Sequence, residues 1–216
     1  MRTLSFLLAV IVTLTIVSVS LNIHIYNEDF YFSEFEKNGV YDEIGKEQVL
    51  ENYDLLMGYF KNENNLKDSF FNEKEKWHMK DVKNLILRAK YLLYALTFIL
   101  ALTLLYFLIR KDFRTALNGM IYGGIATAAI IGLMLAIASI NFPVMFLQFH
   151  FAFFTNELWQ LNPETDKLIV MFPEEFFYDS FGEIFINSLI IAILNLIVAF
   201  ALKHYIAYKK RGDINW

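Results

Sequence analysis

Four long runs of uncharged, mostly apolar residues constrain this chain more than any other feature. None of them contains Asp, Glu, Lys or Arg, and they cover residues 3–21, 91–109, 116–140 and 184–202. About 20 such residues are enough for an α-helix to cross the hydrocarbon core of a bilayer. The sequence therefore predicts an all-α membrane protein with four transmembrane helices, arranged as a single membrane-embedded domain over residues 1–216.

The first run also has features of a secretion signal. It follows Arg2, and Ser18 and Ser20 resemble the small residues of a cleavage site. However, three more runs follow it, and it is longer than a usual signal-peptide core. We therefore interpret it as an uncleaved signal anchor.

The basic residues near the ends of the runs predict the orientation of the chain. The chain is 56% hydrophobic and 19% charged, so its charge must be concentrated between the runs. One set of ends contains eight basic residues and only Asp112 and Asp213 as acids; the basic residues are Arg2, Arg110, Lys111, Arg114, Lys203, Lys209, Lys210 and Arg211. Because basic ends remain in the cytoplasm, we expect both termini to be cytoplasmic.

Residues 24–88, between the first and second runs, then form an extracytoplasmic lobe. This segment is acidic, and its aromatic and aliphatic residues recur at a spacing that predicts short helices with one apolar face. About 60 residues are marginal for a free-standing core, so we expect this mostly helical lobe to pack on the membrane end of the bundle. Asp68 or Ser69 is the expected N-cap of the helix that follows.

Residues 141–183, between the third and fourth runs, form a second outer segment. Residues 143–154 are aromatic and apolar but too few to cross a bilayer, which predicts a re-entrant or interfacial segment. At the start of the third run, Gly119, Gly123 and Gly124 predict that another helix approaches closely.

Composition excludes several kinds of chemistry. A formal net charge of −4 gives no reason to expect a nucleic-acid partner. The chain has no Cys, so a disulfide, a thiolate metal site and a Cys nucleophile are excluded. No Ser lies in a nucleophile-elbow pattern. Of the four histidines, His24 and His204 have no neighbours that suggest a role.

The other two histidines lie in patterns that suggest acid–base chemistry. His78 is three residues from both Glu75 and Asp81, so a helix places the three side chains on one face. Several lysines surround it, and a solvated face with charge pairs is the simpler interpretation. His150 has only apolar neighbours, and titratable groups near a membrane are costly and tend to be functional.

A metal site is an alternative for the same residues. His78 and His150 together with Asp81, Glu75 or Asp166 could bind zinc. The spacings His-x₃-His and His-Glu-x-x-His are absent from the sequence. We therefore predict neither a metal nor a cofactor.

The distance of His78 from the second run is a geometric difficulty. Along a straight helix His78 lies about 20 Å from Tyr91. A bend near Asn84, or a span that begins near Leu85, would bring it closer to the membrane.

Two motifs contain these histidines. The first reads Glu75-x-x-His78-Met79-x-Asp81-Val82-Lys83, and the second reads Phe149-His150-x-x-Phe153-Phe154-x-Asn156-x-x-Trp159-x-x-Asn162-Pro163-x-Thr165-Asp166-x-Leu168-Ile169. Together they resemble the Lit-type lipoprotein intramolecular transacylase family. Four spans with both termini inside agree with this family, and the likeness covers nearly the whole chain.

The resemblance implies an enzyme of the bacterial cell membrane with its active site on the outer face. Members of the family move the sn-2 acyl chain of an S-diacylglyceryl-cysteine to the α-amine of that cysteine. The product is an N-acyl, S-monoacylglyceryl (lyso) lipoprotein. The implied partners are diacylglyceryl-modified lipoproteins and membrane lipid, without a cofactor, and we expect a monomer.

The resemblance also implies roles for individual residues. His78 and His150 are the expected catalytic pair. We favour His150 as the general base because its apolar setting would keep it neutral, with Asp81 orienting or charge-stabilising His78. The expected donors to the oxyanion are Asn84, Asn156 and Lys83. The other supporting residues of the motifs are Glu75 and Asp166.

Three functions from other classes compete with this interpretation. The main one is a non-catalytic membrane accessory protein whose outer lobe binds a partner. A small transporter is disfavoured because no charged residue lies inside any of the four runs. A metal-dependent membrane hydrolase is the third.

Overall fold

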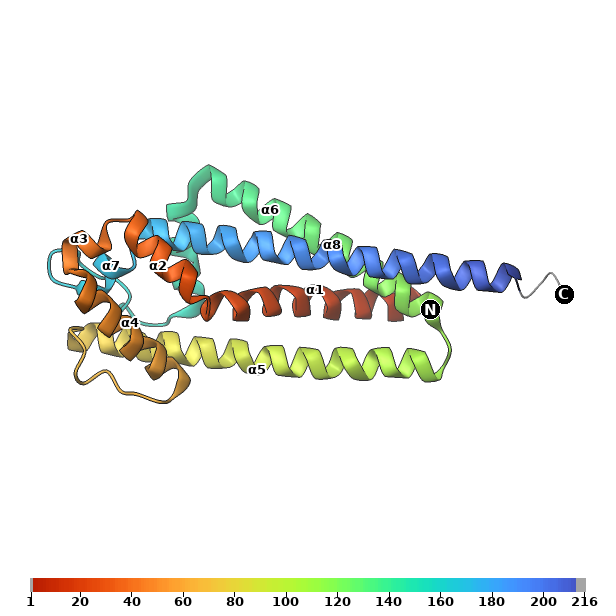
Figure 1. The fold of residues 1–216 in the computed structure, drawn as a ribbon, viewed down its shortest axis with the longest axis horizontal. Helices are drawn as coiled ribbons and strands as arrows, with labels where there is room; N and C mark the ends of the chain where they lie inside the picture. Colours follow the sequence, from red (N-terminus) through yellow and green to blue (C-terminus); the bar gives the residue numbers. More distant parts are fainter. Residues whose placement is uncertain (1, 213–216) are drawn as a thin grey trace. The chain divides into compact units, whose positions relative to one another are not determined.

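The computed structural model describes residues 2–212, and all regular secondary structure in this range is helical (Figure 1). The helices in chain order are α1 (Arg2–Ile25), α2 (Glu28–Lys37), α3 (Val40–Ile44), α4 (Lys46–Lys61), α5 (Glu73–Ile109), α6 (Phe113–Phe153), α7 (Lys167–Met171) and α8 (Glu174–Gly212). Four of them, α1, α5, α6 and α8, are long and apolar enough to cross a membrane. The predicted all-α membrane fold with four spans is therefore confirmed.

The long helices extend well beyond the apolar runs. α5 has 37 residues and α8 has 39, although about 20 are enough to cross a bilayer. In α5 the helix begins at Glu73, so the polar stretch around His78 and the apolar run after Tyr91 are one continuous helix.

α6 is interrupted at Asn141, directly after the third apolar run of the sequence. Asn141 has non-helical dihedral angles (φ −160°, ψ 83°), and Pro143 follows two residues later. Proline has no backbone N–H to continue the helical ladder. The Asn141 side chain instead accepts the Val144 N–H at 3.1 Å, which starts the second half of the helix. The half that carries His150 therefore has its own direction.

The chain divides into two compact units. We call the first the membrane unit; its described part comprises residues 2–23, 90–136 and 182–212. We call the second the lobe unit; it comprises residues 24–89 and 137–181. Each unit is assembled from stretches that are not consecutive in the sequence. Each of the four long helices contributes residues to both units.

All four long helices contribute to the core of the membrane unit. Leu8, Val12 and Ile16 of α1 pack with Phe107 of α5, Ala116 of α6 and Ala192 of α8. Polar side chains in this unit bond to backbone carbonyls of neighbouring helices. The Thr13 hydroxyl donates to the Gly123 carbonyl at 3.0 Å, and the Asn195 amide donates to the Met120 carbonyl at 2.8 Å. Such bonds satisfy groups that lipid cannot.

The glycines at the start of α6 allow α1 to approach closely, as predicted. A Cβ atom at Gly119 would lie 2.7 Å from Leu8 Cδ2. At Gly123 it would lie 2.6 Å from Val12 Cγ1 and 3.0 Å from the Ala9 carbonyl oxygen. At Gly123 one of the two obstructing atoms belongs to the backbone, so a rearrangement of side chains alone does not relieve the clash.

We therefore predict that Gly123→Ala lowers the free energy of unfolding by about 1–3 kcal/mol, the usual cost of overpacking. Gly132→Ala is the matched control because a Cβ atom there meets nothing within 4 Å. Removing a glycine from the interior of a helix should make that control neutral or slightly stabilising. Thermal unfolding in detergent measures both, and equal midpoints for the two variants would contradict the close α1–α6 packing.

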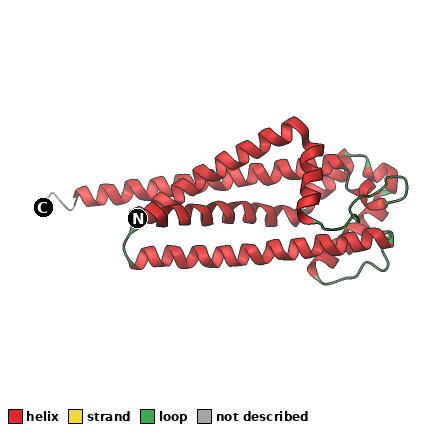
Figure 2. Ribbon diagram, turned by 180° about the vertical axis from the view of Figure 1, so that it is seen from behind, coloured by secondary structure: helices red, strands yellow, loops and turns green. Residues whose placement is uncertain are grey.

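The lobe unit has a core rich in aromatic residues, to which both of its segments contribute. Phe35 and Tyr53, from α2 and α4, pack with Met171 and Phe172 at the end of α7 and with Phe176 of α8. Loops join these short helices (Figure 2). The expected short amphipathic helices are present, and residues 24–88 complete their core with residues from the second outer segment. This shared core brings the two sequence motifs into one unit.

Candidate active site

The helix that carries His78 begins with a reciprocal pair of hydrogen bonds. Asn72 Oδ1 accepts the Glu75 N–H at 3.1 Å, and Glu75 Oε2 accepts the Asn72 N–H at 2.6 Å. This is a capping box, which satisfies two N–H groups that the first turn leaves free. The expected cap at Asp68 or Ser69 is wrong, because α5 begins four or five residues later, at Glu73.

Glu75 also joins α5 to the second motif. Its other oxygen, Oε1, accepts the Leu168 N–H in α7 at 2.5 Å, and the residue is 1% exposed. Burial raises the pKa of Glu75, while the hydrogen bonds from the backbone of Leu168 and Asn72 lower it. Among the described residues Glu75 makes no hydrogen bond to His78, so its observed role is to hold α5 against α7.

Asp166 completes this connection. Its carboxylate accepts the Asn162 N–H at 2.8 Å and the Asn72 side-chain amide at 2.8 Å, with Lys74 Nζ 3.9 Å away. Burial raises the pKa of Asp166, but the hydrogen bonds from Asn162, Asn72 and Thr165 outweigh it and hold the pKa below its usual range. Asn72, Glu75 and Asp166 therefore form one network that fixes the first turn of α5.

His78 is buried at the next turn of α5. It is 7% exposed, and its ring meets the Phe154 ring edge-on with a centroid separation of 5.1 Å. Burial lowers the pKa of His78 to about 4, and the charge of His150 acts in the same direction, whereas Asp81 opposes it. Its Nδ1 is buried without a hydrogen-bond partner among the described residues. His78 is therefore a neutral imidazole at pH 7.

His150 lies in the second half of α6 among aromatic rings. Its ring centroid is 4.5 Å from Phe146, 5.7 Å from Phe154 and 4.7 Å from Trp159, on which it stacks. Its Nδ1 lies 2.8 Å from the Phe146 carbonyl oxygen. A carbonyl oxygen can only accept, so Nδ1 carries the proton and Nε2 has the free lone pair. Burial lowers the pKa of His150, while the bond to Phe146 raises it.

The structure thus brings both predicted histidines into contact with the same ring, that of Phe154. A hydrogen bond joins their two chain segments close by, since the Asn156 amide donates to Asp81 Oδ2 at 2.8 Å. Among the described residues Asp81 makes no hydrogen bond to His78, so it acts on that ring through its charge. Asp81 instead joins α5 to the segment that follows α6 through its hydrogen bond with Asn156.

The three predicted oxyanion donors have different surroundings. The Asn156 side-chain amide is hydrogen-bonded to the Asp81 carboxylate. Lys83 Nζ lies 3.9 Å from the centroid of the Tyr59 ring, a cation–π contact. Asn84 is exposed on α5. Of the three, Asn156 is the one whose position near the histidines is fixed by a hydrogen bond.

Sequence reasoning missed the structural parts of the site. It expected aromatic walls from Phe149 to Phe154 around the histidines but assigned no role to Trp159 or the Phe146 carbonyl, which contact the His150 ring. Phe154 and Trp159 lie inside the second motif, but their contacts with the histidine rings depend on how the chain turns after α6. The Asn72 cap was detectable, because Asn-x-x-Glu is a capping-box spacing.

The other titratable groups of the site do not form a metal-ligand set. Among residues 2–212, no three His, Asp or Glu side chains come together in an arrangement that could hold a metal ion. Of the remaining histidines, His24 is 4% exposed and meets Phe30 edge-on at 4.6 Å, whereas His204 is exposed on α8. His24 is thus a packed residue of the lobe unit, which its sequence neighbours did not suggest.

The fold and the site together define the class of protein. It is an all-helical membrane protein with two neutral histidines packed against aromatic rings. The model of the lipoprotein intramolecular transacylase Lit family matches residues 6–177. The chain belongs to this family of acyltransferases, and the resemblance seen in the two motifs is confirmed. The comparison with curated proteins found no match.

Solved structures of one enzyme from Bacillus cereus share the fold. The membrane integral lipoprotein intramolecular transacylase Lit from that organism is 25% identical over 97% of each chain, with a TM-score of 0.81. A variant of it with a histidine replaced by alanine is 27% identical over 97% of this chain and 94% of that one, with a TM-score of 0.74. A variant with arginine at that histidine has a TM-score of 0.75, at 24% identity over 98% of this chain and 94% of that one.

The low pKa of His78 predicts how stability depends on pH. In the unfolded chain the ring binds a proton near pH 6.5, but in the folded protein only near pH 4. Between these values the unfolded state binds more protons, so the free energy of unfolding falls as pH falls. The contribution present above pH 6.5 and lost by about pH 4 is on the order of 3 kcal/mol.

Chemical unfolding in detergent at pH 7 and pH 5 measures this loss. His78→Gln removes the titrating group, so its unfolding free energy should fall less than that of the wild-type protein over this interval. His204→Gln, which removes an exposed histidine, should follow the wild-type protein. Identical pH dependence in His78→Gln and wild type would show that the buried ring does not resist protonation.

Proposed function

We propose that this protein moves the sn-2 acyl chain of an S-diacylglyceryl-cysteine to the α-amine of the same cysteine. The amine nitrogen attacks the ester carbonyl, a C–N bond forms, and the bond from the carbonyl carbon to the glycerol oxygen breaks. The amine loses one proton and the glycerol oxygen gains one. The product is an N-acyl, S-monoacylglyceryl lipoprotein.

The pairing of His78 and His150 around Phe154 carries this proposal. Both amine and ester belong to one substrate, so the protein's main task is to hold them in reach and to transfer protons. No acyl-enzyme is required, which suits a chain without cysteine.

His150 is the proposed general base. The bond from its Nδ1 to the Phe146 carbonyl directs the lone pair of Nε2 away from that carbonyl. Burial keeps the ring neutral at pH 7, and a neutral imidazole can accept the proton of the attacking amine. The aromatic rings around it limit water, which would otherwise compete with the amine.

His78 is the proposed partner that receives the proton taken up by His150 and passes it to the leaving glycerol oxygen. It is neutral at rest, and the charge of Asp81 favours its protonated form during the reaction. Asn156 is the first candidate to donate to the oxyanion, because Asp81 holds one of its two N–H groups and the other remains for substrate. Asn84 of α5 is the alternative, whereas Lys83 points to the Tyr59 ring on another face of that helix.

The proposed location is the outer face of a bacterial cell membrane, with both termini in the cytoplasm. The lobe segments follow the first and third spans. Two crossings separate them, so four spans put them on the same side. The basic residues gather at the opposite ends of the spans, which favours cytoplasm there. The proposed partners are diacylglyceryl-modified lipoproteins and membrane lipid, and the proposed active form is a monomer.

The decisive experiment is mass spectrometry of a lipoprotein's N-terminal peptide from cells with and without this chain. Appearance of the N-acyl, S-monoacylglyceryl form only with the chain supports the proposal. If the peptide stays diacylated, the chain is better explained as an accessory protein. Chelator treatment of the purified protein tests the remaining rival: transfer should persist, and its loss would favour a metal-dependent hydrolase.

We predict that His78→Ala and His150→Ala each reduce transfer by about 10²–10⁴-fold, the usual contribution of a general acid or base. His204→Ala is the control, because its side chain is exposed on α8. The assay is formation of N-acylated peptide by each purified variant, with folding checked by thermal unfolding. Near wild-type transfer by His150→Ala would remove it as the base.

Asp81→Asn is expected to have a milder effect than either histidine variant. An amide in place of the carboxylate removes the charge that favours protonated His78. It also replaces the acceptor for the Asn156 amide with a neutral group. We expect lower kcat with little change in KM, measured with a diacylglyceryl-cysteine peptide. A loss as large as that of His78→Ala would instead assign Asp81 a direct part in proton transfer.

A further inference from the structure

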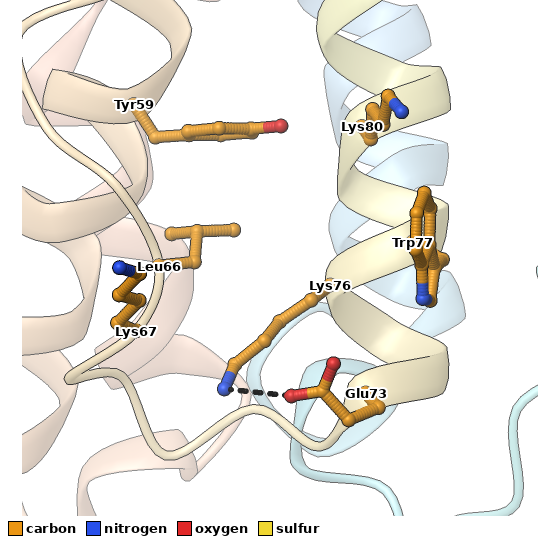
Figure 3. A pocket seen from close by; sticks show the side chains of 7 residues that line it. All are labelled: Tyr59, Leu66, Lys67, Glu73, Lys76, Trp77 and Lys80. Atoms are coloured by element: carbon orange, nitrogen blue, oxygen red, sulfur yellow. Dashed lines mark hydrogen bonds and ion pairs between the residues drawn. The ribbon is translucent and has the colours of Figure 1, made fainter.

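A second concave site lies in the lobe unit, away from the histidines. It is a cavity of about 290 Å³ lined by Tyr59 and the loop residues Leu66 and Lys67, and by Glu73, Lys76, Trp77 and Lys80 of α5 (Figure 3). Tyr59 and Leu66 face α5 from one wall, and Lys76 reaches across toward them.

The cavity has a positive charge in an otherwise acidic lobe. Three lysines line it, and Glu73 is the single carboxylate among the lining residues, paired with Lys76 at 3.3 Å. Lys83 lies over the Tyr59 ring at 3.9 Å and adds a fourth ammonium group nearby. An anionic ligand complements this arrangement.

Exposed aromatic surface accompanies the charge. Trp77 is 53% exposed, and Lys80 lies over its ring at 4.6 Å. Lys76, Lys80 and Lys83 follow each other at helical spacing, so they share one face of α5. His78 is two residues from both Lys76 and Lys80, which turns it about 200° away, on the opposite face. The cavity is therefore not part of the histidine site.

Continuity with the histidine site favours a polypeptide over a free lipid headgroup. Lys76 and Lys80 flank His78 in the sequence, so the cavity lies within one turn of α5 from the proposed site of transfer. The polypeptide of a lipoprotein begins at the cysteine whose amine reacts there.

We propose that the cavity between the end of α4 and the start of α5 binds the polypeptide that follows the lipidated cysteine of the substrate, and that it selects acidic side chains there. This inference rests on the proposed function. The exposed side chains of Trp77 and Asn84 form the path around α5 from the histidine face to the lysine face. A few extended residues, at about 3.3 Å each, span that distance.

Binding of blocked lipopeptides to the full-length protein in detergent tests this inference. The probes carry an N-acetylated S-diacylglyceryl-cysteine followed by four residues that are acidic, neutral or basic. Acetylation prevents transfer, so binding is measured apart from catalysis. Wild-type protein should bind the acidic probe roughly three- to tenfold more tightly than the neutral one at low salt, with the difference shrinking as salt is raised.

Lys76→Gln with Lys80→Gln should abolish this preference. The matched control is Lys46→Gln with Lys167→Gln, which removes the same charge from other parts of the lobe unit and should retain it. Trp77→Ala should weaken binding of all three probes. Equal binding of acidic and neutral probes by wild-type protein, or a preference that survives in the Lys76/Lys80 variant, overturns the inference.

Binding to vesicles with and without anionic lipid tests the alternative that the cavity holds a lipid headgroup. If the Lys76/Lys80 variant loses vesicle binding but keeps the peptide preference, the cavity is a headgroup site and the inference is wrong. Free-amine forms of the same lipopeptides separate it from the proposed function. Absence of transfer from every one of them refutes the transacylase proposal, whereas the charge-dependent binding of the blocked probes decides this inference alone.

Discussion

The buried carboxylate of Glu75 is the interaction on which the rest of the lobe unit depends. One oxygen closes the capping box with Asn72, and the other accepts a backbone N–H from Leu168, 93 residues away in sequence. A buried carboxylate is costly unless hydrogen bonds compensate it. Here the compensating donors come from two chain segments, so the charge is stable only when those segments meet. The first turn of α5, and hence the place of His78, follows from that meeting.

The same region shows how environment sets the protonation of the two histidines. Phe154 contacts both rings, further aromatic side chains surround His150, and burial is the largest cause of the shift of each pKa. The carboxylates of the motifs are used elsewhere: Glu75 and Asp166 hold backbone, and Asp81 holds Asn156. Neutral imidazoles are what a proton transfer at neutral pH requires. A carboxylate directly bonded to either ring would have favoured its charged form.

One helix, α5, separates two kinds of surface by its periodicity. Its buried face presents His78 to Phe154, and its opposite face presents Lys76 and Lys80 to a cavity that the exposed Trp77 also lines. This separation places the proposed reaction site and the proposed recognition site within a few residues of each other on one helix. It also explains why the lysines around His78 in sequence do not keep that ring solvated.

The sequence by itself determined the four spans, the close approach of another helix at Gly123, the end of the third run before Asn141 and the choice of His78 and His150 as candidates. Each of these depends on consecutive residues or on local backbone chemistry. Only the tertiary structure decided that Glu75 bonds α7 and not His78, that Asp81 bonds Asn156, and that the His78 ring meets Phe154. The partners in those contacts are 75 or more residues apart. Helical spacing shows which face a side chain occupies, but the packing of distant segments decides what that face meets.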